Sequence, residues 1–197
     1  MDKINIVYID DRHDEILSRY LGEEYTHPDF EIEHEDVEFD PNKGYESLIQ
    51  NPSVMHANII IIDSRLFENS TANSKFTGEE FKLILKKYYP FIEVIVITQN
   101  DADTTVGTIS KYNPNLKCSG SEYYAKELPP CIDGAIKNIT TFRKLANKLN
   151  NNDSWEPILK EKIIASMQGT NIYDELTKND IDNLISAFKE IQVKLDG

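Results

Sequence analysis

Short apolar runs alternate along the chain with longer segments whose apolar residues recur at helical spacing. Nearly continuous runs of β-branched and apolar residues predict buried strands, because a strand covered on both faces needs few polar positions. Three such runs are residues 4–9, 59–62 and 94–97. A more polar run with Ile32, Val37 and Phe39 predicts a strand over 30–39, nearer the edge of a sheet. Residues 121–125 are a candidate for a fifth strand.

Helical segments are expected between and after these strands. They cover residues 14–21, 45–49, 77–88, 102–112 and 132–149, with stops at Gly22, Pro90 and Pro114. The first of the longer ones begins with a capping box, in which Thr77 accepts from the backbone while Glu80 reaches back. Strands that alternate with helices favour parallel pairing through right-handed crossovers. We therefore expect an α/β domain with a doubly wound parallel sheet of five strands over residues 1–149.

The chain changes character at a polar break over residues 150–153, which predicts a C-terminal helical extension over 150–197. Two helices are expected in it, over 155–167 and 178–195. The second has a broad apolar face, formed by Ile181, Leu184, Ile185, Phe188, Ile191 and Leu195. An apolar face of this width must be buried. Packing against the first domain, self-association and a protein partner are all open at this stage.

Charge limits the classes of partner. The chain has 34 acidic and 21 basic residues and a net charge of -13, concentrated in residues 1–46. Nucleic acid is therefore not an expected partner, since its binding relies on clustered Lys and Arg. No apolar run is long enough to span a membrane, so we expect a cytoplasmic protein without a membrane partner. Cys118 and Cys131 form no C-x-x-C pair and fit a reducing compartment.

Polar side chains suited to chemistry follow three of the apolar strands. Asp10 and Asp11 end the first, Asp63 ends the next buried run, and Thr98 ends the one after it. Ligands of open parallel sheets gather at the carboxyl ends of the strands, so these side chains are expected to converge. Carboxylates about 4 Å apart repel by roughly 4 kcal/mol per pair at an effective dielectric near 20. A magnesium ion answers that repulsion, and Lys126, after the fifth strand candidate, is expected to add a second positive charge.

This pattern of Asp10, Asp11, Asp63, Thr98 and Lys126, with Tyr123 three residues before the lysine, resembles the receiver domain of bacterial two-component response regulators. The resemblance covers residues 1–149. It implies a flavodoxin-like sheet with strand order 2-1-3-4-5 and a signalling rather than an enzymatic protein.

The resemblance also implies a role for each position. Asp63 would accept a phosphoryl group from a sensor histidine kinase or a phosphotransfer protein. Asp10, Asp11, Asp63 and the backbone carbonyl of Arg65 would bind Mg²⁺. The remaining implied roles are phosphoryl contacts for Thr98 and Lys126 and a switch for Tyr123. The output would be a protein or a homodimer contacted through the C-terminal helices, as part of a phosphorelay.

Two alternatives stay open. Gln99 after Thr98, the absence of proline directly after Lys126 and the long segment between Asp63 and Gly78 favour a pseudo-receiver that binds proteins without phosphorylation. A magnesium-dependent phosphohydrolase similar to the haloacid dehalogenases would use the same acids, but that class requires D-x-D after the first strand, where this chain has two adjacent acids.

Overall fold

A computed structural model describes residues 2–40, 42–66, 77–99, 108–152, 154 and 157–168. Five parallel strands form one sheet in the order β2-β1-β3-β4-β5. The strands are β1 (Asp2–Asp10), β2 (Phe30–Glu38), β3 (Ile59–Asp63), β4 (Glu93–Thr98) and β5 (Thr108–Ser110). The flavodoxin-like fold class and its strand order are thereby confirmed.

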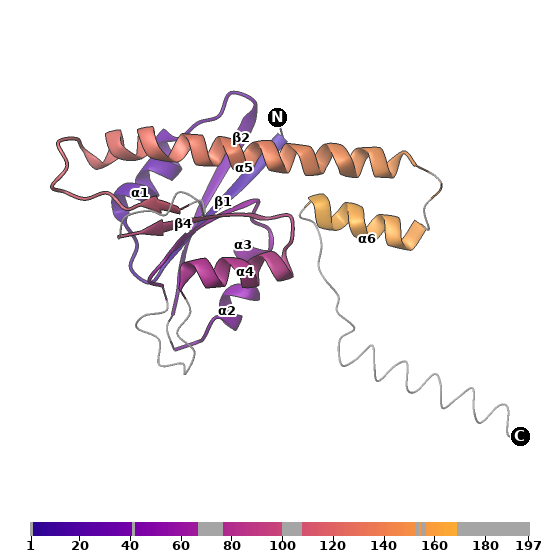
Figure 1. The fold of residues 1–197 in the computed structure, drawn as a ribbon, viewed down its shortest axis with the longest axis horizontal. Coiled ribbons are helices and arrows are strands. Elements are labelled where there is room, and N and C mark those ends of the chain that lie inside the picture. The colour runs from indigo at the N-terminus through magenta and orange to yellow at the C-terminus, as the bar shows by residue number, and fades with distance from the viewer. Residues whose placement is uncertain are drawn as a thin grey trace, which may run out of the picture.

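Helices cover both faces of the sheet (Figure 1). One face carries α1 (Glu15–Arg19), a π-helical turn η1 (Tyr20–Glu24) and α5 (Gly120–Asn150). The other carries α2 (Glu46–Ile49), α3 (Pro52–Met55) and α4 (Gly78–Tyr88). Alternate residues of β1 serve the two cores: Ile4, Ile6 and Tyr8 pack towards α5, while Val7 and Ile9 pack towards α4.

Two elements near the end of the sheet differ from the sequence-based expectation. The fifth strand is Thr108–Ser110, within the segment predicted as a helix over 102–112, of which 102–107 lie outside the described residues. The predicted strand 121–125 is instead part of α5. That helix begins in a capping box, because the Ser119 hydroxyl accepts from the backbone of Glu122 and the Glu122 carboxylate accepts from the backbone of Ser119. The adjacent tyrosines 123 and 124 suggested a strand, but they face the core from a helix.

The helices predicted over 14–21, 45–49 and 77–88 agree with the structure to within a few residues, whereas the one predicted over 132–149 is only the C-terminal part of α5, which begins at Gly120. The capping box of Thr77 and Glu80 starts α4 as expected. Gly22 does not stop the first helix, because the chain continues through η1 and ends its helical path at Tyr25. A Cβ at Gly22 would lie 3.2 Å from the His34 ring, so close packing explains this glycine better than a helix stop.

The long helix α5 runs beyond the sheet, and α6 (Pro157–Gln168) folds back beside it (Figure 1). This agrees with the first predicted helix of the extension. The second, over 178–195, lies outside the described residues. No helix in the described part of the chain is long and apolar enough to cross a membrane.

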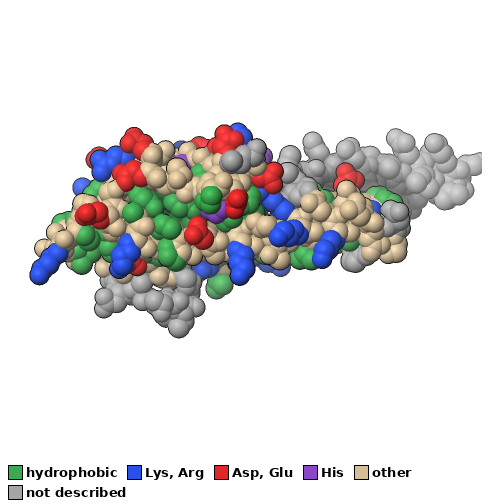
Figure 2. Space-filling model, turned by 90° about the horizontal axis from the view of Figure 1, so that it is seen from above, with side chains coloured by type: hydrophobic (Ala, Val, Ile, Leu, Met, Phe, Trp, Pro, Cys, Tyr) green, Lys and Arg blue, Asp and Glu red, His purple; other side chains and the backbone are tan. Residues whose placement is uncertain are grey.

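Charge is distributed unevenly over the surface. Figure 2 views the molecule from the side of α5. Lys and Arg side chains follow the helix, whereas Asp and Glu side chains lie mainly along the upper border of this view. The exposed lysines of α5 are Lys126, Lys137, Lys144 and Lys148.

Candidate functional site

Four strands end at the same edge of the sheet and bring their terminal polar residues together. Asp10 ends β1, Asp63 ends β3 and Thr98 ends β4. All three are buried, with Asp10 1% and Asp63 4% exposed. The parallel register places Asp63 beside Ile97 and Thr98 beside Ser110, so the ends of β3, β4 and β5 lie in step. This is the edge at which ligands of open α/β sheets bind.

The three predicted aspartates form one cluster. One carboxylate oxygen from each of Asp10, Asp11 and Asp63 lies within 4.8 Å of the others. Asp63 Oδ1 is fully buried, and the Lys111 ammonium lies 2.9 Å from it. Three carboxylate oxygens gathered at one point fit a hard divalent cation, since Mg²⁺ prefers carboxylate oxygens.

A lysine already lies between two of these acids. Lys111 Nζ is 2.7 Å from Asp10 Oδ2, to which it donates a hydrogen bond, and it forms an ion pair with Asp63 Oδ1 at 2.9 Å. Its side chain is only 12% exposed. Lys111 directly follows β5, and its backbone N–H donates to the Thr98 carbonyl at 2.6 Å. The carboxyl end of the fifth strand therefore supplies the counter-charge that the acids need.

The sequence-based choice of Lys126 for this position is wrong. Lys126 lies in α5, its side chain is 82% exposed, and it pairs with the adjacent Glu127. The error follows from placing the fifth strand at residues 121–125. The sequence signal near Lys111 is the β-branched pair Thr108 and Ile109, which favours a strand but is too short to identify one by itself.

The predicted switch residue, Tyr123, also comes from α5 rather than from a strand. It nevertheless contacts the end of β5, because its hydroxyl donates to the Ser110 carbonyl at 2.9 Å. Its ring packs against those of Tyr112 and Tyr124. Tyr123 thus lies beside the site, on the helix that covers it.

The charges shift one another's pKa values in different directions. Burial alone would raise the pKa of Asp10, but hydrogen bonds from Lys111 and Tyr8 outweigh it and hold that pKa below its ordinary value. Burial raises the pKa of Asp63, helped by the nearby charge of Asp10, and Lys111 offsets this only in part. Burial lowers the pKa of Lys111 less than its two carboxylate partners raise it, so the net shift is upward.

The loop after β3 holds Asp63 in place. Its Oδ2 accepts from the backbone N–H of Arg65 at 3.0 Å, and the Ser64 hydroxyl donates to Thr98 Oγ1 at 3.0 Å. The N-terminus of α4 packs onto the same loop, since a Cβ at Gly78 would lie 2.6 Å from the Asp63 carbonyl. Only glycine permits this approach, which brings the positive end of α4 close to the acids. Sequence reasoning found Asp63 and Thr98 but missed the roles of Ser64 and Gly78.

Comparisons with known proteins find similar chains among solved structures. No protein-family model matches the chain, and no curated protein is similar to it. Among solved structures, it is similar to a two-component transcriptional regulator, AraC, from Clostridium phytofermentans ISDg, with 15% identity over 73% of this chain and 99% of that one and a TM-score of 0.42.

A second similar structure is a response regulator protein from Burkholderia pseudomallei, which contains a phosphorylated aspartic acid, a calcium ion and citrate. It shares 12% identity over 86% of this chain and 99% of that one, with a TM-score of 0.36. Both are proteins of the class that the sequence resembles. Both similarities are too low to carry an argument about function.

Proposed function

We propose that this protein is a response-regulator receiver that accepts a phosphoryl group on Asp63 in a Mg²⁺-dependent reaction. One observation carries the proposal: at the carboxyl edge of a 2-1-3-4-5 sheet, a nearly buried lysine bridges two buried aspartates, and a third aspartate completes the cluster. A metal site alone would not need the lysine. A site that also holds a phosphoryl group has to neutralise the phosphoryl oxygens as well as the carboxylates, and the lysine adds positive charge for this.

The chemistry follows from the charges. An Asp63 carboxylate oxygen attacks phosphorus, and the bond from phosphorus to the donor's nitrogen breaks, so that an acyl phosphate forms and the donor leaves with the electron pair. Asp10, Asp11, Asp63 and the carbonyl of Arg65 would hold Mg²⁺, which supplies positive charge for the phosphoryl oxygens. Lys111 keeps its proton and can turn from the Asp63 carboxylate to a phosphoryl oxygen. Thr98 would contact the same group through its hydroxyl.

The signalling role extends the same proposal. A sensor histidine kinase or phosphotransfer protein would supply the phosphoryl group in the cytoplasm. Tyr123 would report the change, because its hydrogen bond to Ser110 lies one residue before Lys111. The output would be a protein or a second copy of the chain, contacted through the C-terminal helices. The exposed side chains of Leu145 on α5 and Ile158 on α6 support this location.

Phosphorylation by a small phosphodonor tests the proposal. Incubation of the full chain with acetyl phosphate and Mg²⁺, followed by intact-mass measurement, should add one phosphoryl group. Asp63→Asn should abolish the gain, and Lys111→Ala should reduce it strongly. Lys126→Ala is the matched control and should behave as the wild type.

Two outcomes would contradict the assignment. Retention of the mass gain in Asp63→Asn would mean that another residue is the acceptor. A wild type that binds Mg²⁺ in a titration but gains no mass would favour the pseudo-receiver instead.

A further inference from the structure

A ring of hydrogen bonds, closed by the peptide link between Lys111 and Tyr112, connects the acidic site to the start of α5. Asp10 Oδ2 accepts from the Tyr8 hydroxyl, which in turn accepts from the backbone N–H of Asp14 at 3.2 Å. Asp14 Oδ2 accepts from the Tyr124 hydroxyl at 2.6 Å. That hydroxyl accepts from the backbone N–H of Tyr112 at 3.2 Å. The next residue back is Lys111, which donates to Asp10 and closes the ring.

The ring joins four separate parts of the fold. Tyr8 and Asp10 belong to β1, Asp14 is the N-cap of α1, Tyr124 lies in the second turn of α5, and Tyr112 lies in the loop after β5. Asp14 has two tasks, since Oδ1 caps α1 by accepting from Ile16 and Leu17 while Oδ2 holds Tyr124. The proposed Tyr123 switch is not a member of the ring.

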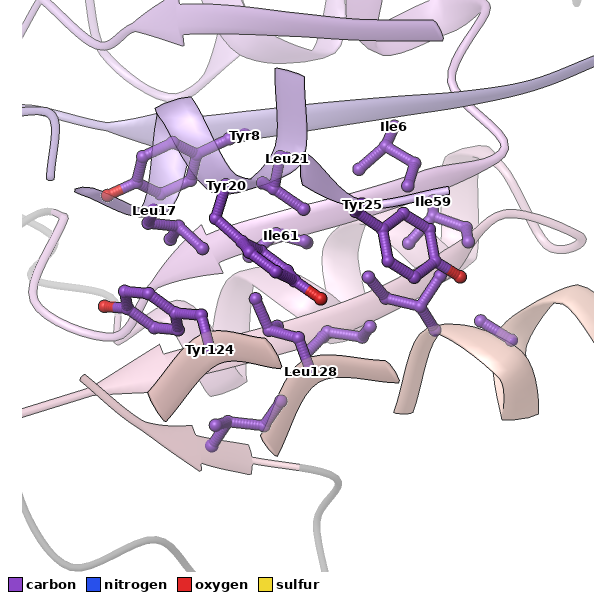
Figure 3. Packing of buried hydrophobic residues seen from close by; sticks show 14 of the residues in the cluster. Ile6, Tyr8, Leu17, Tyr20, Leu21, Tyr25, Ile59, Ile61, Tyr124 and Leu128 are labelled. Atoms are coloured by element: carbon purple, nitrogen blue, oxygen red, sulfur yellow. The ribbon is translucent and has the colours of Figure 1, made fainter. Parts of the chain in front are cut away.

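The two tyrosines and Asp10 in the ring are buried, while Asp14, Lys111 and Tyr112 are partly buried. Tyr8 and Tyr124 are both fully buried. In Figure 3 their hydroxyls point the same way, whereas those of Tyr20 and Tyr25 in the same core point the other way. A buried hydroxyl needs a partner, so a change at Asp10 or Lys111 bears on the hydrogen bonds of the two buried tyrosines. The rest of the ring must adjust.

We propose that Tyr8 is a positioning residue for cation binding at Asp10, and that Asp14 and Tyr124 couple the occupancy of the site to the first turns of α5. The inference rests on the proposed function and deepens it. A cation on the Asp10 carboxylate competes with the Lys111 ammonium for the same oxygens. Displacement of Lys111 moves the adjacent Tyr112 N–H, which is a hydrogen-bond donor to Tyr124.

The first measurement is the Mg²⁺ dissociation constant by calorimetry. Tyr8→Phe should weaken Mg²⁺ binding by roughly tenfold, because groups that orient a metal ligand typically carry an effect of this size. Tyr25→Phe is the matched control. Tyr25 lies in the same core, and its hydroxyl also bonds to a carboxylate, that of Asp133, but far along α5 from the site. The control should keep the wild-type constant.

The second measurement is hydrogen exchange of the backbone amides of residues 120–128, with and without Mg²⁺. In the wild type Mg²⁺ should change their exchange rates. Asp14→Asn keeps an N-cap side chain for α1 but replaces the oxygen that accepts from Tyr124. It and Tyr124→Phe should remove most of the Mg²⁺-dependent change, while Tyr25→Phe should retain it. Because coupling is reciprocal, both ring variants should also shift the Mg²⁺ constant.

The outcomes separate this inference from the proposed function. A wild type that binds no Mg²⁺ would overturn both. Normal Mg²⁺ binding with equal constants for Tyr8→Phe and Tyr25→Phe would overturn the positioning role alone. An Mg²⁺-dependent exchange change that survives in Tyr124→Phe and Asp14→Asn would overturn the coupling alone. Circular dichroism of each variant checks that it is folded.

Discussion

Acidic side chains gather in two regions of this protein with opposite consequences. At the carboxyl edge of the sheet, Asp10 and Asp63 are buried and share Lys111. Along the outer strand β2, five acids are exposed to water: Glu31, Glu33, Glu35, Asp36 and Glu38. Lys3 pairs with Glu31 and Glu33 there, but more than half of its side chain is exposed.

The same residue type therefore serves two physical purposes. In water, ion pairs are screened and contribute little, so the acids of β2 mainly protect an unpaired sheet edge from joining another strand. In the buried cluster, each charge depends on its neighbours, and removal of the lysine would leave two carboxylates without compensation. Burial, rather than the number of acids, distinguishes a candidate site from an acidic surface.

The largest effect is expected for Lys111→Met. The variant leaves two buried carboxylates without a counter-charge, which should lower the free energy of unfolding by about 3–5 kcal/mol at neutral pH without a divalent cation. Urea unfolding measures this loss, and millimolar Mg²⁺ should restore part of it. Lys126→Met is the control, with an expected change near zero. Similar losses for the two variants would contradict the assignment of Lys111.

Smaller effects on the free energy of unfolding are expected for substitutions of the two buried aspartates, and the two effects should have opposite signs. Asp10→Asn removes the acceptor of hydrogen bonds from Lys111 and Tyr8 and should destabilise the cation-free protein by about 1–3 kcal/mol. Asp63→Asn removes a carboxylate whose pKa is raised by burial and should increase stability slightly. Unfolding of both variants in EDTA measures the difference. Destabilisation of equal size by the two substitutions would contradict the unequal roles inferred from their environments.

The dependence on pH sharpens this prediction. The folded-state pKa of Asp63 is raised above its ordinary value of 3.8, so its unfavourable contribution is complete above the raised pKa and disappears as the pH falls to 3.8. The advantage of Asp63→Asn should shrink over that window. The pKa of Asp10 is lowered, so its stabilisation is present above 3.8 and is lost as the pH falls through the lowered value. The deficit of Asp10→Asn should therefore persist to lower pH.

The smallest effect is expected on the outer strand. Glu33→Gln removes an exposed partner of Lys3 and should change the free energy of unfolding by no more than about 0.5 kcal/mol. Its Mg²⁺ constant should equal that of the wild type. A loss as large as that of Asp10→Asn would mean that exposed and buried acids do not differ as inferred.

Reasoning from the sequence found most of the fold and most of the acidic cluster for one reason. Buried parallel strands have nearly continuous apolar sequences, and their final residues lie at one edge of the sheet. The sequence alone therefore predicts that Asp10, Asp11, Asp63 and Thr98 lie together. The capping box at Thr77 identified the start of α4 for a similarly local reason. Signals of this kind depend only on neighbours in the chain.

The lysine could not be placed in the same way. The strand β5 is only three residues long and, among the described strands, pairs with β4 alone, so its pattern is too short to be distinguished from a helix or a loop. Tyr123 and Tyr124 look like strand residues, but the capping box at Ser119 and the core beneath α5 make them helical. The spacing of three residues between Tyr123 and Lys126 was therefore a poorer guide to the lysine of the site than β5, the strand that precedes Lys111.

Local patterns thus determined, without coordinates, that this is a doubly wound α/β protein with carboxylates at one edge, because burial periodicity and strand ends are properties of consecutive residues. Tertiary structure alone decided that Lys111 rather than Lys126 neutralises those carboxylates, and that Tyr8, Asp14 and Tyr124 link them to α5. Those contacts join residues up to 110 positions apart. Their energies depend on burial and distance, which the order of residues along the chain does not specify.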